Sequence, residues 1–322
     1  MTRTREEMQK TVSSAVETMF AVLASGAIAS AGTDFSVPSI DLSLLKGSEA
    51  ERASLAEQLR SCCHDGCGFF YLCGHGVDNA FIDSVSRLAL QALSLSEATK
   101  AIIDKRNSPH FRGWEQVGSE RTGGIQDMRE QIDTWSELEA VEESDACPPY
   151  KRLLGPNQFF DDGTLPGYKE LTLAYHERMS EVARQLLEAF SLALELPPDA
   201  LDRRFGEQRM SLIKYIRYPP TPAGGQGVGL HQDSAYLTLL LPGEEAGLEC
   251  MLPNGQMMSV GRKEGCFVVN LGEALQQMTG NVRAAGEQTL DHVPLRLLRR
   301  PCFLTCAHPR CDSISWQLRI VC

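Results

Sequence analysis

The sequence has no long hydrophobic run, no excess of basic residues and no internal repeat. No stretch approaches the roughly 20 consecutive apolar residues that a membrane-spanning helix needs, so we expect no contact with the bilayer core. Acidic residues outnumber basic ones by 42 to 31, and the resulting net charge of −11 repels phosphate backbones. The composition therefore argues against nucleic acid and membranes as partners.

Zinc-finger spacing is also missing. The 11 cysteines are scattered, apart from the adjacent pair Cys62–Cys63, and no CxxC pair lies near a histidine. This pattern predicts reduced thiols and a cytoplasmic location. The apolar segment 19–31 resembles a signal-peptide core, but acidic residues precede it. We therefore interpret 1–35 as a poorly specified leader.

The first half of the chain has mainly helical periodicity. Apolar residues recur at intervals of three and four, which predicts helices over 48–64, 81–95 and 168–196. The aromatic segment 69–72 predicts a strand between the first two. The polar, glycine-bearing stretch 108–145 carries neither period, and we assign it no helix or strand.

Beyond Arg209 the period changes to two. Alternation and short apolar runs predict strands at 210–218, 236–241, 248–252, 257–260 and 266–270. Asn254–Gly255 lies between two of these segments and is a strong hairpin signal. Helices followed by closely spaced strands indicate an α+β fold with a sandwich or barrel at the C-terminal end.

His231 and Asp233 are the best candidates for a metal site. Side chains two positions apart in an extended strand point to the same face, so this imidazole and carboxylate can converge on one point. With a distant second histidine, such a pair forms the facial triad that holds Fe(II) and leaves positions open for other ligands. A lone His-x-Asp is more often an ordinary surface pair, so its surroundings decide.

The surroundings resemble the 2-oxoglutarate/Fe(II)-dependent dioxygenases of the isopenicillin N synthase-like superfamily. The matching segments occur in the family order: VPSIDLS at 37–43, GFFYLCGHGV at 68–77, REQIDTW at 129–135, GVGLHQDSAYLTLLL at 227–241 and GCFVVNLGEALQQMTGN at 265–281. The resemblance implies a double-stranded β-helix of jelly-roll type with a helical N-terminal region.

The same resemblance suggests a division of the chain. After the leader, we expect a dioxygenase N-terminal region over 36–150, a connecting helix over 151–208 and the β-helix domain over 209–322. The last part contains the candidate metal pair.

The resemblance also implies a reaction. Members oxidise a small organic substrate by hydroxylation, desaturation or cyclisation, with Fe(II), O2 and 2-oxoglutarate as co-substrate. His231 and Asp233 would bind the iron, and Tyr218 would contact the co-substrate carboxylate. Two alternatives stay open: a catalytically silent binding protein with the same fold, and an Fe(II) oxidase that does not use 2-oxoglutarate.

After Asn281 the sequence departs from the family pattern. Relatives carry a distal iron histidine here, followed by an Arg-x-Ser whose arginine pairs with the co-substrate carboxylate. This chain has no Arg-x-Ser in that region, and His292, 61 residues after His231, is the nearest substitute for the third iron ligand. An altered C-terminal coding sequence is our hypothesis for the change. If the tail is genuine, we expect two ligands alone to bind iron weakly and the last strands of the β-helix to be unpaired edges.

Overall fold

The computed structural model describes residues 36–64, 68–141, 147–205, 209–220, 225–245, 247–252, 254–280, 303–306 and 315–321. The described residues from Val37 onward belong to one compact unit, which contains all the elements below. None of the helices within the described ranges is long and apolar enough to cross a bilayer.

The helices lie mainly in the first two thirds of the chain. They are α2 (Glu49–His64), α3 (Asn79–Ser94), α4 (Glu97–Lys100), α5 (Tyr168–Ala193) and α6 (Glu273–Gly280), with short 3-10 turns η1 (Leu42–Lys46), η2 (Ala101–Ile103), η3 (Lys105–Asn107), η4 (Pro149–Leu153) and η5 (Asp202–Phe205). The three predicted helices are confirmed as α2, α3 and α5. The longest one, α5, ends three residues before the predicted end, because Glu195 takes a left-handed conformation with φ of 58°.

The strands form two main sheets. The larger has the order β1-β2-β12-β9-β14-β7-β6-β3, the smaller the order β11-β10-β13-β8, and β4 and β5 make a separate hairpin. Their bounds are β1 Ser39–Asp41, β2 Phe69–Cys73, β3 Gly113–Glu115, β4 Arg121–Thr122, β5 Ile125–Gln126, β6 Glu130–Trp135, β7 Leu212–Tyr218, β8 Val228–His231, β9 Leu237–Pro242, β10 Leu248–Met251, β11 Met257–Ser259, β12 Phe267–Leu271, β13 Phe303–Cys306 and β14 Ser315–Val321.

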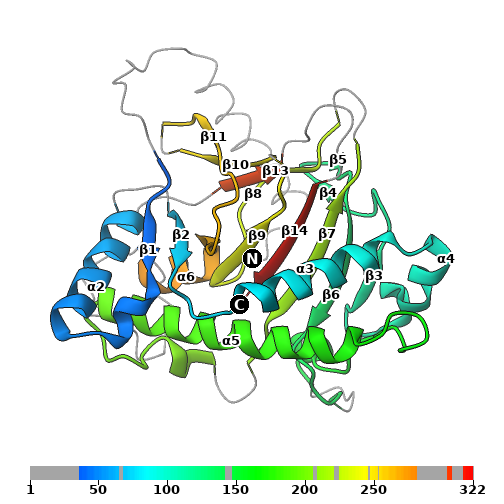
Figure 1. The fold of residues 1–322 in the computed structure, drawn as a ribbon, viewed down its shortest axis with the longest axis horizontal. Helices are drawn as coiled ribbons and strands as arrows, with labels where there is room; N and C mark the ends of the chain where they lie inside the picture. Colours follow the sequence, from blue (N-terminus) through cyan, green and yellow to red (C-terminus); the bar gives the residue numbers. More distant parts are fainter. Residues whose placement is uncertain are drawn as a thin grey trace, which may run out of the picture. The chain divides into compact units, whose positions relative to one another are not determined.

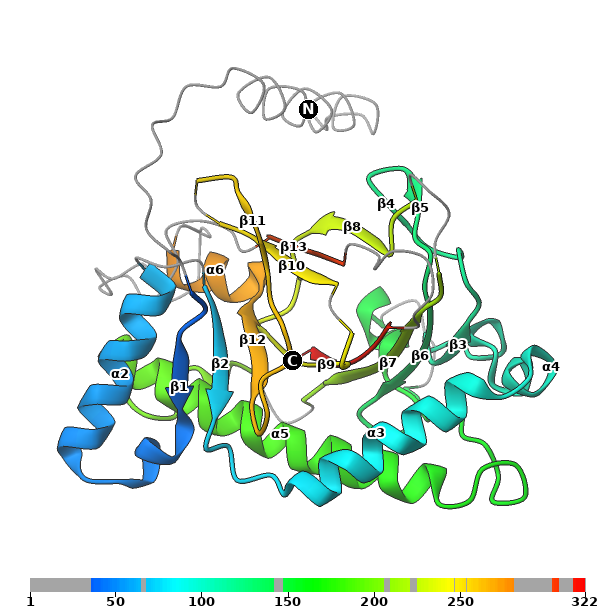
Figure 2. The ribbon, with the colours of Figure 1, turned by 45° about the horizontal axis from the view of Figure 1, so that its top comes forward.

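Different elements lie on the two faces of the large sheet. Figures 1 and 2 show α3 and α5 running along one face of it, while the strands of the smaller sheet lie on the other side. The central strands β9 and β12 are buried at every position, which explains their nearly continuous apolar sequence. The helical layer therefore covers one face of the large sheet, and the smaller sheet lies on the side of the other face.

The stretch 108–145 is more regular than the sequence suggested. It contains β3, β4, β5 and β6, and β6 is an inner strand of the large sheet. No strand was predicted in this stretch, which was wrong, because β6 is polar and yet buried. Its residues Glu130, Gln131, Asp133 and Thr134 are each at most 2% exposed. A run of polar residues reads as an exposed loop in the sequence, even when the folded chain buries it.

The expectation of unpaired strands at the C-terminal end is also wrong. β13 pairs with β10 and β8, and β14 pairs with β7 and β9 along the middle of the large sheet. Backbone hydrogen bonding depends on position rather than on side-chain alternation, so these segments join the sheets without the family sequence pattern.

The expectation of reduced thiols is wrong for one pair of cysteines. Cys73 and Cys266 form a disulfide between β2 and the start of β12, with Cα atoms 4.4 Å apart. The antiparallel register, in which Leu72 opposes Phe267, brings these two residues face to face. Cys62 and Cys147 are thiols.

Candidate active site

The structure brings His231 and Asp233 together. His231 ends β8, and its Nε2 lies 3.5 Å from Oδ1 of Asp233. The other ring nitrogen, Nδ1, lies 2.8 Å from the carbonyl oxygen of Gly229, which fixes the ring so that Nε2 faces the carboxylate. Two ligands of one octahedral metal ion lie about 3 Å apart, so the observed separation is compatible with a shared cation.

Two buried side chains orient the Asp233 carboxylate. Thr238 Oγ1 donates to Oδ2 at 2.6 Å, and Asn270 Nδ2 donates to the same oxygen at 2.9 Å. The donors face each other across β9 and β12. Such partners typically fix the direction of a ligating carboxylate. Neither residue was predicted from the sequence, although a polar residue inside the apolar run of β12 was an available signal.

The backbone around Asp233 is packed against the start of α6. Glu273 N–H donates to the Asp233 carbonyl at 2.7 Å, and Gly272 N–H donates to the Tyr236 carbonyl at 2.9 Å. A Cβ atom at Gly272 would lie 1.8 Å from the Ala235 carbonyl oxygen. Only glycine fits at this close approach, so position 272 helps to hold the segment that carries the carboxylate.

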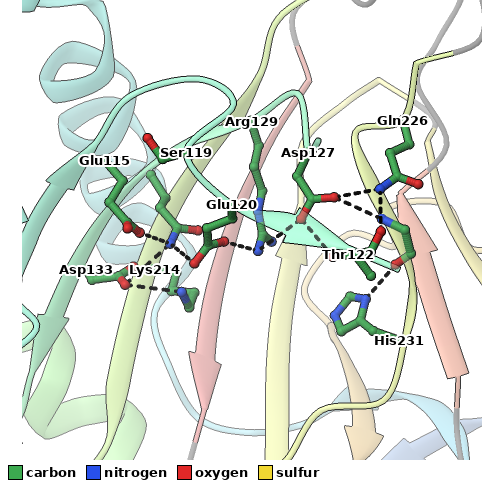
Figure 3. A network of polar contacts seen from close by, with 12 residues as sticks. Glu115, Ser119, Glu120, Thr122, Asp127, Arg129, Asp133, Lys214, Gln226 and His231 are labelled. Atoms are coloured by element: carbon green, nitrogen blue, oxygen red, sulfur yellow. Dashed lines mark hydrogen bonds and ion pairs between the residues drawn. The ribbon is translucent and has the colours of Figure 1, made fainter. Parts of the chain in front are cut away.

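The β4–β5 hairpin is tied to β8 by Asp127. This fully buried carboxylate accepts from Gln226 Nε2 at 2.8 Å, from Thr122 Oγ1 at 2.8 Å and from the Gly229 N–H at 3.4 Å. Figure 3 shows Asp127 between Arg129 and Gln226, with His231 close by. The polar network thus reaches the backbone segment that orients the histidine.

Tyr218 ends β7 and is fully buried. Arg129 interacts with Tyr218, forms an ion pair with Glu120 and lies 4.0 Å from Asp127. Burial lowers the pKa of Arg129, but its interactions with Tyr218 and Glu120 outweigh burial and raise the pKa overall. Arg129 and Tyr218 both adjoin the paired residues Glu130 and Arg217 of β6 and β7, so a cation lies near the tyrosine that the family resemblance assigns to the co-substrate.

The donor set suits Fe(II) as far as it is described. An imidazole and a carboxylate from one segment are two of the three protein ligands of a facial triad. Within the described ranges, no group of three His, Cys, Asp or Glu residues could hold a metal ion. The predicted third ligand, His292, lies outside those ranges.

Two family models match the chain, one in each half. Residues 37–162 match the non-haem dioxygenase in morphine synthesis N-terminal family. Residues 207–292 match the 2OG-Fe(II) oxygenase superfamily. The two matches flank α5 and together include β1 to β12.

Among curated proteins, the chain is 30% identical over 253 residues to a 2-oxoglutarate-dependent dioxygenase of Dothideomycetidae sp., covering 77% of this chain and 67% of that protein. It is 29% identical over 277 residues to a homoarginine-6-hydroxylase of Arabidopsis thaliana, covering 81% of each.

Solved structures agree on the fold. A full-length Neurospora crassa protein in complex with alpha-KG superposes with a TM-score of 0.69 at 18% identity, over 89% of this chain and 84% of that chain. A 2OG-Fe(II) oxygenase family protein of Caulobacter crescentus gives a TM-score of 0.68 at 21% identity, over 89% and 86%. The predicted jelly-roll core with additional helices is confirmed.

Proposed function

This chain belongs to the 2-oxoglutarate/Fe(II)-dependent dioxygenase family, whose members act on small molecules with Fe(II), 2-oxoglutarate and O2, and from this premise we propose that His231 and Asp233 are two of its iron ligands. The observation that carries the proposal is the 3.5 Å approach of His231 Nε2 to Asp233 Oδ1, with the carboxylate oriented from behind by Thr238 and Asn270. His292 is the proposed third ligand.

The protein's own residues would have three tasks. His231 and Asp233 would hold the metal, which supplies the oxidising chemistry when bound. Thr238 and Asn270 keep the carboxylate pointed at the metal position by occupying its second oxygen. Tyr218 is the proposed contact for the co-substrate carboxylate.

We also propose a small organic substrate and no nucleic-acid or membrane partner, in line with the net charge of −11. Two similar proteins point to small molecules: the homoarginine-6-hydroxylase by its name, and the Neurospora crassa protein by its complex with thymine. The division at 36–150, 151–208 and 209–322 remains part of the proposal. So does a cytoplasmic location, which the thiols of Cys62 and Cys147 support and the Cys73–Cys266 disulfide does not.

Metal binding tests the site directly. The full chain should bind one Fe(II) in anaerobic equilibrium dialysis, and His231→Ala should abolish this uptake because it removes one of the proposed ligands. His110→Ala is the matched control, since His110 Nδ1 contacts only the Arg152 carbonyl in the described structure. Unchanged iron stoichiometry in His231→Ala would refute the assignment.

Co-substrate turnover separates the main proposal from its alternatives. With Fe(II), ascorbate and 2-oxoglutarate, the protein should form succinate slowly even without its substrate. Iron binding without succinate formation would favour an oxidase that does not use 2-oxoglutarate. Absence of iron binding would favour a silent binding protein.

A further inference from the structure

A second polar cluster lies on the same face of the large sheet as Thr238, the residue that binds Asp233. We call this face the inner face. Lys214 of β7 and Leu240 of β9 both pair with position 319 of β14, and residues paired across antiparallel strands point to the same face. Lys214 therefore lies on the face of Leu240 and of Thr238, two residues away, which binds Asp233. Its other neighbour is Asp133 of β6.

Salt bridges and hydrogen bonds hold this cluster together, and Figure 3 shows the salt bridge between Lys214 and Asp133. Lys105 Nζ donates to Glu115 Oε2 at 2.8 Å and to Asp133 Oδ2 at 3.0 Å. Lys214 Nζ donates to the same Asp133 oxygen at 3.2 Å. Gln131 Nε2 donates to Glu115 Oε2 at 2.7 Å. We call these five residues the inner cluster.

Two acceptors of the inner cluster have no donor among the residues that the structure describes. Asp133 Oδ1 and Gln131 Oε1 are buried and make no hydrogen bond to any part of the chain that the structure describes. Asp133 is 2% exposed and Gln131 is 1% exposed. A buried acceptor without a partner is costly, and both atoms belong to adjacent inward positions of one strand. Their natural partner is a ligand with several N–H donors.

The charge of the surroundings favours a cation. The inner cluster and its neighbours hold four carboxylates and three cations, a net charge of −1: Glu115, Glu120, Asp127 and Asp133 against Lys105, Arg129 and Lys214. The ammonium group of Lys105, held between two carboxylates, shows what chemistry the site accepts. An anionic ligand would meet the same unpartnered acceptors and be repelled.

A cavity adjoins the inner cluster on the side of β3. Its volume is about 410 Å³, and Lys105, Glu115 and Phe111 lie in its wall. Asp133 and Gln131 do not line it, but they bond directly to its wall residues Lys105 and Glu115. Phe111 is 60% exposed and has a left-handed backbone with φ of 58°, a strained state for a bulky residue. Its ring already faces the Lys105 ammonium at 5.9 Å. Such a ring offers a face to a bound cation.

We propose that the substrate carries a cationic group with several N–H donors, of the guanidinium or amine class, and that Asp133, Gln131 and Phe111 bind it. This inference rests on the proposed function, because it takes the shared sheet face as the wall of the substrate site. Asp133 and Gln131 are thus specificity-determining residues that lie on a strand away from the metal ligands.

Matched neutral probes test the charge requirement. Alkylguanidines from methyl to hexyl and the corresponding alkylureas have the same shape, but only the guanidines are charged. Binding to the full chain is measured by isothermal titration calorimetry without iron. At least one guanidine should bind about tenfold more tightly than its urea, the difference expected for a hydrogen bond to a charged group.

Variants locate the preference. Asp133→Asn should remove the preference for guanidines over ureas. Gln131→Glu should strengthen guanidine binding, because this substitution places a second carboxylate at an unpartnered acceptor. Asp161→Asn, at an exposed carboxylate that accepts from Thr164, should leave it unchanged. Near-UV circular dichroism verifies that each variant is folded, and Gln131→Glu decides the question if Asp133→Asn does not fold.

The proposal is overturned if no guanidine binds better than its urea, or if folded Asp133→Asn keeps the preference. His231→Ala separates this inference from the proposed function, since the guanidine preference should survive loss of the metal ligand. Iron binding and succinate formation without a guanidine preference would leave the dioxygenase assignment intact and remove only the substrate class.

Discussion

Replacing Thr238 by valine should weaken iron binding without changing the fold. Valine keeps the size and branching of the side chain but removes the hydroxyl that donates to Asp233 Oδ2 at 2.6 Å. Loss of a partner of a metal ligand typically costs 10- to 100-fold in metal affinity. Because Asn270 still donates to the same oxygen at 2.9 Å, we expect the lower end, about tenfold or about 1.4 kcal/mol.

The assay measures the dissociation constant for Fe(II) by calorimetry, as Fe(II) is titrated anaerobically into the full chain. Thr172→Val is the matched control, since Thr172 is also fully buried and its hydroxyl bonds to Tyr215 at 3.1 Å, beneath the opposite face of the sheet. Both variants lose one buried hydrogen bond, so urea unfolding should show a comparable loss of stability. The reasoning fails if Thr238→Val binds iron like the wild type, or if Thr172→Val weakens binding equally.

Two further predictions concern stability. Glu130→Gln should lower the free energy of unfolding in urea by about 3–5 kcal/mol, because it leaves the buried ammonium of Lys100, now 2.6 Å from Glu130 Oε2, without its carboxylate. The control Glu188→Gln, at a half-exposed ion pair, should lower it by less than about 1 kcal/mol. Equal losses for the two variants would contradict the argument. Burial lowers the pKa of His176 to about 4, below the ordinary value of about 6.5, so the unfolded chain takes up the proton first as the pH falls. Between pH 7.5 and 5 the wild type should therefore lose about 2 kcal/mol more than His176→Gln, and parallel pH profiles would show that this histidine is not responsible.

The local parts of the site were accessible from the sequence. The spacing of His231 and Asp233 predicts that their side chains share one side of an extended segment, since the period of a strand is two. In the structure their functional atoms are 3.5 Å apart. The long helices were equally accessible, because an apolar stripe with a period near 3.6 needs only neighbouring residues to be recognised.

The polar strand β6 shows where sequence patterns stop. Gln131 and Asp133 read as part of a loop, because a polar residue is usually exposed, yet both are buried on the inner face of the large sheet. What makes them a strand is pairing with β3 and β7, and the residues paired with them lie 16 to 85 positions away along the chain. No window of neighbouring residues contains that information.

The sequence by itself determined the family, the helices and the pair of candidate iron ligands, because each depends on short-range spacing or on motifs in a fixed order. Only the tertiary structure decided that Thr238 and Asn270 support Asp233, that Cys73 meets Cys266 and that Asp133 shares a face of the large sheet with Thr238. These contacts join strands that are distant in sequence, and their register is set by the packing of the whole sheet rather than by any one segment.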